Sequence, residues 1–334
     1  MSSVPDIVEF FTTLPLFRGL DAHQLEQLAR MVRPFEFGPA KTLFRQGDAS
    51  DGMYFIRSGS VEICARVPGD AAMTFRLVGP GDILGEVALL DRGVRTATAF
   101  TKEPTAGYWL GRRHFETLRL DRTPASLMIM QRVIDNTCVS VRRSFELIAN
   151  LHREAAPLPR SPPKHTIDFC EADKTGIPFE SLPFFSRLSS DDLQDFLRAG
   201  RLLEAKRGST FYCQGSLSDE VYLVLRGALR SMLQHGQARF QIAVHPPGSI
   251  VGVLSALDGK PDATSCEACE LTRVLALKAT NITLLQDAHT PLAWYLTEHI
   301  QEGLADVLRQ CTDHIFRLEL ERQLNAGGKG ASDV

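Results

Sequence analysis

One segment of the chain has the residue types to bind a small anion: residues 85–99 read GEVALLDRGVRTATA. Gly85 lets the backbone approach a ligand closely, and the residues after it favour a short helix whose free N–H groups attract negative charge. Glu86 supplies a carboxylate suited to a hydroxyl donor such as a ribose 2′-OH, and Arg95 supplies a permanent cation with a planar fork of donors. A phosphate joined to a sugar would satisfy all three. The alternative is a surface ion pair of Arg95 with a nearby aspartate and a solvated Glu86.

This segment resembles the phosphate-binding cassette of the cyclic nucleotide-binding domain superfamily, which includes the bacterial CRP/Fnr regulators and the regulatory subunit of cAMP-dependent protein kinase. The family pattern is Gly-Glu-x-Ala-Leu, a variable turn and Arg-x-Ala. The residues that match it are Gly85, Glu86, Ala88, Leu89, Arg95 and Ala97. The resemblance implies that Arg95 binds the cyclic phosphate and Glu86 the ribose hydroxyl. Backbone amides from Gly85 through Val87 to Ala88 would complete the shell.

The base of the implied nucleotide is less well specified. Thr96 follows the arginine, and in the kinase branch of the family a Thr there favours cGMP, while bacterial regulators with Ser or Thr at this place bind cAMP. In the bacterial regulators a Thr-Ser pair on the long helix contacts the adenine, and Asn136 and Thr137 align there. Both side chains can hydrogen-bond a purine edge, with a simple polar helix face as the alternative. We expect cAMP rather than cGMP as the ligand, and no metal.

The two halves of the chain repeat the same residues in the same order. Gln46-Gly47, Asp51, Tyr54 and Gly59 recur as Gln214-Gly215, Asp219, Tyr222 and Gly227 at a constant offset. After a single deletion, Pro80-Gly81, Gly85 and Leu90-Asp91 recur as Pro247-Gly248, Gly252 and Leu257-Asp258. Such agreement in order and spacing indicates an internal duplication into two domains.

Each half has the pattern of a β barrel between helices. Asp21 and Ser189 are placed to cap short N-terminal helices. Stretches such as MYFIRSGSVEICARV and EVYLVLRGALRSML predict short alternating strands with glycine turns. A long helix follows each barrel, predicted over 125–154 and 292–324. The fold class is therefore α+β, with two tandem β-jelly-roll (cupin-like) domains, each flanked by short N-terminal helices and a long C-terminal helix.

Apolar residues follow one face of each long helix. The first stripe is Leu127, Met130, Ile134, Cys138, Val141, Phe145 and Ile148, and the second is Ile300, Leu304, Val307, Cys311, His314 and Leu318. A stripe of this length serves packing on the helix's own barrel or a coiled coil in a homodimer equally well.

The second copy of the cassette has lost the residues that favour an anion. It reads GVLSALDGKPDATSC and keeps Gly252, but Val253 stands at the Glu position and Asp262 at the Arg position. A carboxylate in place of the cation turns attraction for a phosphate into repulsion. Lys260 offers a point charge without the fork. We expect a degenerate domain that keeps the fold and has lost or altered its ligand.

Composition narrows the class of protein. The 334 residues include 37 Lys and Arg against 40 Asp and Glu, so the net charge of −3 provides no global field to hold a nucleic acid, and we expect no DNA partner. No apolar run reaches the roughly 20 residues that cross a bilayer, and Asp6 and Glu9 contradict a signal peptide. The 7 cysteines fit reduced thiols, so we expect a cytoplasmic protein without a membrane partner.

No other motif carries chemistry. Cys266 and Cys269 have zinc-knuckle spacing, but no second pair accompanies them, and we interpret them as core thiols in a strand. The histidines form no H-E-x-x-H motif and suggest no triad. We expect a protein that is not an enzyme.

The sequence therefore predicts a cyclic nucleotide sensor. Its expected domains are a first domain with an intact cassette over 1–153, a Pro-rich linker over 154–176, a degenerate copy over 177–324 and a flexible tail over 325–334. Ligand in the first domain would bias the helices and act through the second domain on an unknown protein partner. A regulatory subunit or scaffold that acts on an enzyme in trans, with no ligand required, is the first alternative. A CRP-like transcription regulator is the second, and no helix-turn-helix is evident.

Overall fold

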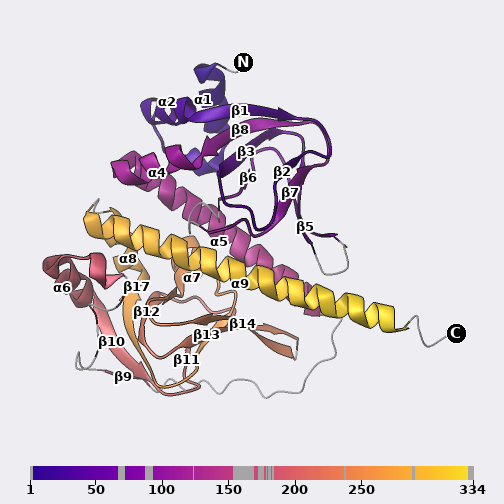
Figure 1. Ribbon diagram of the computed structural model, residues 1–334. Coiled ribbons are helices and arrows are strands. Elements are labelled where there is room, and N and C mark those ends of the chain that lie inside the picture. Colours follow the sequence, from indigo (N-terminus) through magenta and orange to yellow (C-terminus); the bar gives the residue numbers. More distant parts are fainter. Residues whose placement is uncertain are drawn as a thin grey trace. The chain divides into compact units, whose positions relative to one another are not determined.

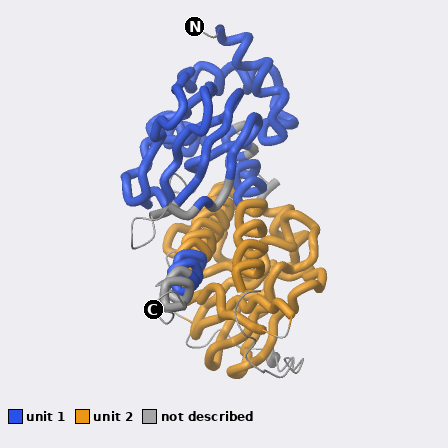
Figure 2. The backbone as a smooth tube through the Cα atoms, turned by 90° about the vertical axis from the view of Figure 1, so that its right-hand side faces the viewer, with its two compact units in different colours: residues 1–137, 315–334 blue, residues 138–314 orange. Residues whose placement is uncertain are grey.

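The structure is a computed structural model of the chain (Figure 1). It describes residues 3–66, 72–86, 93–122, 124–152, 169–171, 177, 179, 182, 184–236, 238–287 and 290–329. The chain divides into two compact units, residues 1–137 with 315–334 and residues 138–314 (Figure 2). Both boundaries fall inside helices, α5 (Pro124–His152) and α9 (Pro291–Lys329). Each long helix therefore contributes residues to both units.

Short helices precede the first barrel, as the sequence predicts. They are α1 (Val4–Thr13), the 3-10 turn η1 (Pro15–Phe17) and α2 (Ala22–Met31). Asp21 caps α2 in a reciprocal capping box with Gln24, which confirms the predicted start of this helix. Ser3 and Asp6 form a second such box at α1. Both caps satisfy N–H groups that the first turn of a helix otherwise leaves free.

The first barrel consists of two four-stranded antiparallel sheets, ordered β1-β8-β3-β6 and β2-β7-β4-β5. The strands are β1 (Val32–Phe37), β2 (Thr42–Phe44), β3 (Gly52–Ser58), β4 (Val61–Arg66), β5 (Ala72–Val78), β6 (Ile83–Leu84), β7 (Thr98–Thr101) and β8 (Thr105–Gly111). Two facing sheets of this kind form a jelly roll. The inner faces meet around Ile56, Val61 and Ala99, which are completely buried.

The second barrel has the same strand order with one additional edge strand, β9. Its sheets run β15-β12-β17-β10-β9 and β11-β16-β13-β14. The strands are β9 (Phe169–Glu171), β10 (Gly200–Ala205), β11 (Thr210–Tyr212), β12 (Glu220–Arg226), β13 (Leu229–His235), β14 (Ala238–His245), β15 (Ile250–Val251), β16 (Ser265–Ala268) and β17 (Thr272–Lys278). The turn η3 (Phe185–Arg187) and helix α6 (Ser190–Arg198) lie between β9 and β10, and Ser189 caps α6 as predicted.

Irregular pairing confirms the duplication in detail. The register of β3 against β8 shifts between Ile56 and Ser58, and that of β12 against β17 shifts at the equivalent Val224 and Arg226. The pairs β2–β7 and β11–β16 share another shift, and so do β4–β5 and β13–β14. Because a bulge bends its strand locally, shared bulges give the two barrels the same curvature at the same places.

The helices after the barrels follow the predicted pattern with two additions. The sequence analysis did not anticipate α4 (Arg112–Asp121) or α8 (Ala279–Asp287), which link each barrel to its long helix. In α5 every residue of the predicted stripe is buried, from Leu127 to Ile148. In α9, Ile300, Leu304 and Cys311 are buried, while the other members of its stripe are half-buried.

Three regions refine the sequence-based boundaries. Strand β9 pairs with β10 inside the segment predicted as a linker, while residues 153–168 and 172–176 lie outside the described part. Helix α9 continues to Lys329, so the predicted tail begins as helix, and 330–334 are outside the described residues. Cys266 is fully buried in β16, whereas Cys269 follows that strand and is only half-buried, which corrects its expected place in the core.

Candidate functional site

The first candidate site is built around the Arg95 side chain, which is 1% exposed. Its Nη1 donates to the carbonyl oxygen of Gly85 at 2.8 Å. Its Nη2 donates to Asp51 Oδ1 and to the carbonyl oxygen of Gly52, both at 2.6 Å. The Phe44 ring lies against the guanidinium, with Cζ 4.1 Å from the ring centroid, a cation–π contact. The structure therefore brings Gly85 and Arg95 together, as the sequence predicts, and Arg95 is no surface residue.

The guanidinium retains a buried donor that the described residues do not use. Arg95 Nε is buried and has no hydrogen-bond partner among the residues that the structure describes. A buried donor without a partner costs free energy, so this N–H is suited to an acceptor that arrives with a ligand. Asp51, the counter-ion, is 60% exposed and lies at the outer edge of the pair. This arrangement fits an anionic group such as a phosphate oxygen.

Position 85 requires a glycine because of its backbone conformation and because Arg95 lies so close. Its φ is +86°, a region that residues with a side chain rarely adopt. A Cβ at this position would lie 2.3 Å from Arg95 Nη1. The absence of a side chain at residue 85 is what allows the guanidinium to reach the Gly85 carbonyl.

The remaining cassette residues surround this pair to the extent that the structure describes them. Glu86 is buried, and Val87 and Ala88 lie outside the described residues. Thr96 is half-buried and Ala97 is buried, between Arg95 and the start of β7. Glu86 is therefore buried beside the Gly85–Arg95 pair and is not the solvated residue of the alternative interpretation.

The candidate base contacts lie on α5. Asn136 is half-buried and Thr137 is completely buried. Thr137 Oγ1 donates to the Val133 carbonyl at 2.8 Å, so in this conformation its hydroxyl proton is used within its own helix. Recognition of a base by these two residues stays a prediction.

Backbone contacts confirm that Asp262 stands where Arg95 stands. In the first domain Gly47 N–H donates to the Arg95 carbonyl at 2.9 Å, and Arg95 N–H to the Asp48 carbonyl at 2.8 Å. In the second, Gly215 N–H donates to the Asp262 carbonyl and Asp262 N–H to the Ser216 carbonyl, both at 2.8 Å. The same loop geometry thus presents a cation in one copy and a carboxylate in the other.

The Asp262 carboxylate is buried and is held by a neighbouring hydroxyl group. Asp262 is 4% exposed and accepts a hydrogen bond from Ser218 Oγ at 2.5 Å. Burial raises the pKa of Asp262 to about 6, although the bond from Ser218 and the charge of Arg142 oppose this shift. A buried carboxylate at this place would repel a phosphate, and the expected loss of the ligand in this domain stays a prediction.

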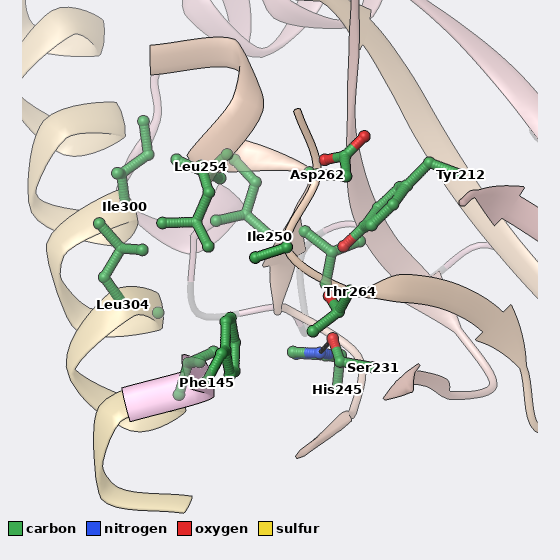
Figure 3. Close-up of a pocket in the computed structure, with 16 residues that line it drawn as sticks. Phe145, Tyr212, Ser231, His245, Ile250, Leu254, Asp262, Thr264, Ile300 and Leu304 are labelled. Carbon is green, nitrogen blue, oxygen red and sulfur yellow. Dashed lines mark hydrogen bonds between the residues drawn. The ribbon is translucent and has the colours of Figure 1, made fainter. Parts of the chain in front are cut away.

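A small cavity lies beside the cassette of the second domain, with Gly252, Val253 and Asp262 among its lining residues (Figure 3). Its volume is about 40 Å³, well below the roughly 300–1,000 Å³ of small-molecule pockets. Phe145 from α5 and Ile300 and Leu304 from α9 line one side, opposite Asp262 and Tyr212 (Figure 3). The cavity has room for a few water molecules and not for a nucleotide.

Polar side chains in this cavity pair with one another. Ser231 Oγ and His245 Nε2 are 2.8 Å apart, and both residues are buried. Burial lowers the pKa of His245 to about 4, so its ring is neutral near pH 7. Burial also raises the pKa of Tyr212 well above its ordinary value. These groups form a neutral buried network.

Sequence reasoning missed three partners of Arg95: Asp51, Gly52 and Phe44. Asp51 was among the repeated positions, which was a usable signal. Its counterpart Asp219 pairs instead with Lys278 at 2.7 Å, since the second copy has no arginine to bind. The carbonyl of Gly52 and the Phe44 ring leave no pattern in the sequence that assigns them to a site.

The fold and the site together define a class of protein. A duplicated jelly roll, with a positive-φ glycine against a buried arginine in one copy, has the features of a binding domain that suits a small anionic ligand. The sequence profile of the cyclic nucleotide-binding domain matches residues 34–121 and 202–288, and the chain belongs to this family. It contains two such domains in tandem, and its relatives include CRP-like regulators and regulatory subunits of cAMP-dependent protein kinase.

Individual relatives match parts of the chain. It is 31% identical over 93 residues to a CRP-like cAMP-activated global transcriptional regulator of Mycobacterium tuberculosis, a match that covers 28% of this chain and 42% of that protein. It is 39% identical over 106 residues to the acetyltransferase Pat of Mycolicibacterium smegmatis, covering 31% of each. The matched regions thus span less than half of these relatives. The regulatory domain of Toxoplasma gondii PKA, co-crystallised with cAMP, aligns over 86% of this chain and 93% of that one at 18% identity and a TM-score of 0.33.

The described part of the chain offers neither a metal site nor a membrane-spanning helix. No group of three or more His, Cys, Asp or Glu side chains in this part of the chain is arranged to hold a metal ion. Among the helices that the structure describes, none combines the length and apolar character needed to span a bilayer.

Proposed function

We propose that the protein is a cyclic nucleotide sensor that binds its ligand in the first domain, with cAMP preferred over cGMP, and signals through its helices and second domain to a protein partner. The observation that carries this proposal is the buried Arg95 guanidinium, whose Nε–H has no acceptor among the described residues. The family shows the class of ligand, and the charge at residue 95 supports the first domain as the site.

The proposed roles follow from the chemistry of each group. Arg95 would donate Nε–H to an equatorial phosphate oxygen while Asp51 and the Gly52 carbonyl hold the guanidinium in place. Glu86 would accept from the ribose 2′-OH. Backbone N–H groups from Gly85 to Ala88 would complete the phosphate shell. Thr96, Asn136 and Thr137 are the proposed contacts to the base.

The second domain is proposed to bind no cyclic nucleotide. Asp262 replaces the arginine, Val253 replaces the glutamate, and the remaining cavity measures about 40 Å³. Repulsion between Asp262 and a phosphate would be strong because the carboxylate is buried. Loss of the second site leaves its fold available for contacts within the protein.

A second candidate function is control of an enzyme, either in trans or as part of a longer chain. The match to the acetyltransferase Pat favours it, because that relative is an enzyme. We propose that the chain itself is no enzyme and that any catalytic activity under its control belongs to a partner. A protein captured with the chain only when a cyclic nucleotide is present would support this candidate.

The test is titration calorimetry with cAMP, cGMP and cyclic dinucleotides. Arg95→Ala should weaken binding by roughly 30-fold or more, since removing one member of a buried charge contact typically costs that much. Arg95→Lys keeps the positive charge but not the planar fork of donors, so its affinity should lie between those of the wild type and Arg95→Ala. Arg33→Ala is the matched control, because Arg33 is exposed on β1 of the same domain. No heat with any ligand would refute the sensor, and full affinity in a folded Arg95→Ala variant would place the site elsewhere.

A further inference from the structure

We propose that the degenerate cassette of the second domain has become a receptor for the chain's own helix α5, whose Arg142 and Phe145 occupy the role of a ligand. We further propose that this contact couples α5 to the state of the first site, and this coupling alone rests on the proposed function. Residues 138–152 of α5 belong to the same compact unit as the second barrel, so the contacts below lie within one unit.

The first observation is that the second cassette takes its cation from α5. The first cassette has its own cation, Arg95, whereas the second has Asp262 at that position. Its Asp258, the counterpart of Asp91, accepts from α5: Arg142 Nε donates to Asp258 Oδ2 at 2.5 Å and Arg142 Nη2 to Oδ1 at 2.8 Å. Arg142 Nη1 also donates to the carbonyl of Pro261 at 2.8 Å. This bidentate geometry is the strongest form of an arginine–carboxylate contact.

The pair is shielded from solvent. The side chain of Arg142 is 15% exposed and that of Asp258 is 20% exposed. Asp262 lies within the electrostatic reach of Arg142 as well, so two carboxylates of the cassette face one helix cation. The loop between them, with the carbonyls of Lys260 and Pro261, is oriented toward the same guanidinium.

The second observation is that α5 also closes the pocket with an apolar side chain. Phe145 lies one helical turn beyond Arg142 on the same face, lines the cavity and is 3% exposed (Figure 3). The cavity that remains beside it is about 40 Å³. A helix that offers a cation to the cassette and an aromatic ring to the pocket satisfies both halves of a former nucleotide site.

The end of α5 provides a third anchor. The His152 ring stacks on Phe240 of β14 with centroids 3.3 Å apart, and His152 Nε2 lies 3.1 Å from His314 Nε2 of α9. The helix is thus held by the second domain at Arg142, Phe145 and His152. Such repeated anchoring indicates a specific docking site rather than incidental packing.

The same helix reaches the first domain. Residues of α5 up to Thr137 belong to the first unit, and Arg132 Nη2 donates to the Arg18 carbonyl there at 3.3 Å. Arg142 follows Thr137 by about 7.5 Å of helix rise. A change at the proposed base contacts Asn136 and Thr137 that moves the helix would therefore act directly on the Arg142–Asp258 pair.

Hydrogen exchange on the full chain tests the docking without any ligand. Arg142→Asp and Asp258→Arg should each speed amide exchange over residues 138–152 by about tenfold or more, because a charge-assisted contact is replaced by repulsion. The double variant should restore slow exchange. Arg143→Asp is the matched control, since Arg143 is the exposed neighbour on the same helix. The docking would be overturned if the single variants exchange no faster than Arg143→Asp. It would also be overturned if exchange in the double variant stays as fast as in the single variants. If the charge-reversal variants do not fold, amide exchange over residues 138–152 is compared between Arg142→Gln and its control Arg143→Gln.

Affinity for cAMP, measured on the same proteins, tests the coupling. Arg142→Gln should change the affinity of the first site about fivefold or more, while Arg143→Gln should leave it unchanged. Equal affinities in the two variants would overturn the coupling. Absence of cAMP binding in the wild type would overturn the proposed function and the coupling together, whereas the exchange result would still decide the docking.

Discussion

The two domains present opposite charges at one pair of equivalent residues. Arg95 and Asp262 occupy loops with matching backbone hydrogen bonds, yet one presents a cation and the other a buried carboxylate. In the first domain Asp51, Gly52, Gly85 and Phe44 hold the guanidinium. The proposed binding of an anion would thus depend on how one arginine is held rather than on net charge.

Gly85→Ala tests this positioning at the scale of one methyl group. The new Cβ would meet Arg95 Nη1 at 2.3 Å in a backbone conformation with φ of +86°, so we expect a loss of about 1–3 kcal/mol in stability and weaker cyclic nucleotide binding. Gly79→Ala is the control, because no atom lies within 4 Å of a Cβ there. Thermal unfolding and calorimetry measure both effects. Equal behaviour of the two variants would contradict the assigned role of Gly85.

We expect the pH dependence of stability to follow from three buried groups of the second compact unit, residues 138–314. Burial lowers the pKa values of His152 and His245 to about 4, so protonating these rings favours unfolding as the pH falls from about 6.5 toward 4. Neighbouring His314 and His235 add to the shift at His152. Asp262 acts in the opposite sense, since its pKa of about 6 lies above the unfolded value of 3.8, and its contribution to stability is lost as the pH rises through 6. Between pH 6.5 and pH 5, the combined effect of the two histidines on the free energy of unfolding exceeds the opposing effect of Asp262.

We therefore expect the free energy of unfolding to fall by about 1–2 kcal/mol between pH 6.5 and pH 5. His245→Gln should flatten this slope, and Asp262→Asn should steepen it. Urea unfolding at a series of pH values measures all three slopes. A slope that does not respond to His245→Gln would show that another group controls it.

At the scale of elements, α5 is the part of the chain that both units share. Its buried stripe runs from Leu127 in the first unit to Ile148 in the second. Phe145→Ala should destabilise the second unit by about 3–5 kcal/mol, because the ring is buried and a cavity already lies beside it. Val139→Ala, at an exposed position of the same helix, should change stability by no more than about 0.5 kcal/mol. Denaturant unfolding distinguishes them, and a small effect at Phe145 would mean that this face of α5 is not anchored.

Much of the architecture was predictable because local patterns determine it. The cap at Asp21, the stripe on α5 and the strands around Gly59 and Gly227 follow from spacing alone. The short helices α4 and α8 were not predicted, since only Phe115 and Leu118 of α4 are buried and so short an apolar pattern is weak. Strand β9 was not predicted, because it lies in a proline-rich segment that is typical of a linker.

The candidate site was predictable only in part. Gly85, Glu86 and Arg95 form a local motif, so the sequence contained them. Asp51 and Phe44 come from distant strands, and the docking of Arg142 on Asp258 joins positions far apart in the chain. Such pairings are set by the closure of the barrel and the packing of helices, which no spacing rule encodes.

For the whole molecule, the two proposals together assign different tasks to the duplicated barrels. The first barrel would bind the cyclic nucleotide, and the second would keep the fold and hold helix α5. The near-neutral net charge of −3 agrees with this division, because the decisive charges are local: Arg95 in one cassette, Asp258 and Asp262 in the other. Signal transfer would then depend on the helix between them and not on a general electrostatic field.

The number of cyclic nucleotides bound per chain tests the central claim most directly. Equilibrium dialysis of the full chain with radiolabelled cAMP should give one ligand per chain at saturation, and Arg95→Ala should need roughly 30-fold more cAMP or a still higher concentration to reach the same occupancy. Two ligands per chain, or wild-type affinity in a folded Arg95→Ala variant, would contradict the assignment of binding to the first domain alone.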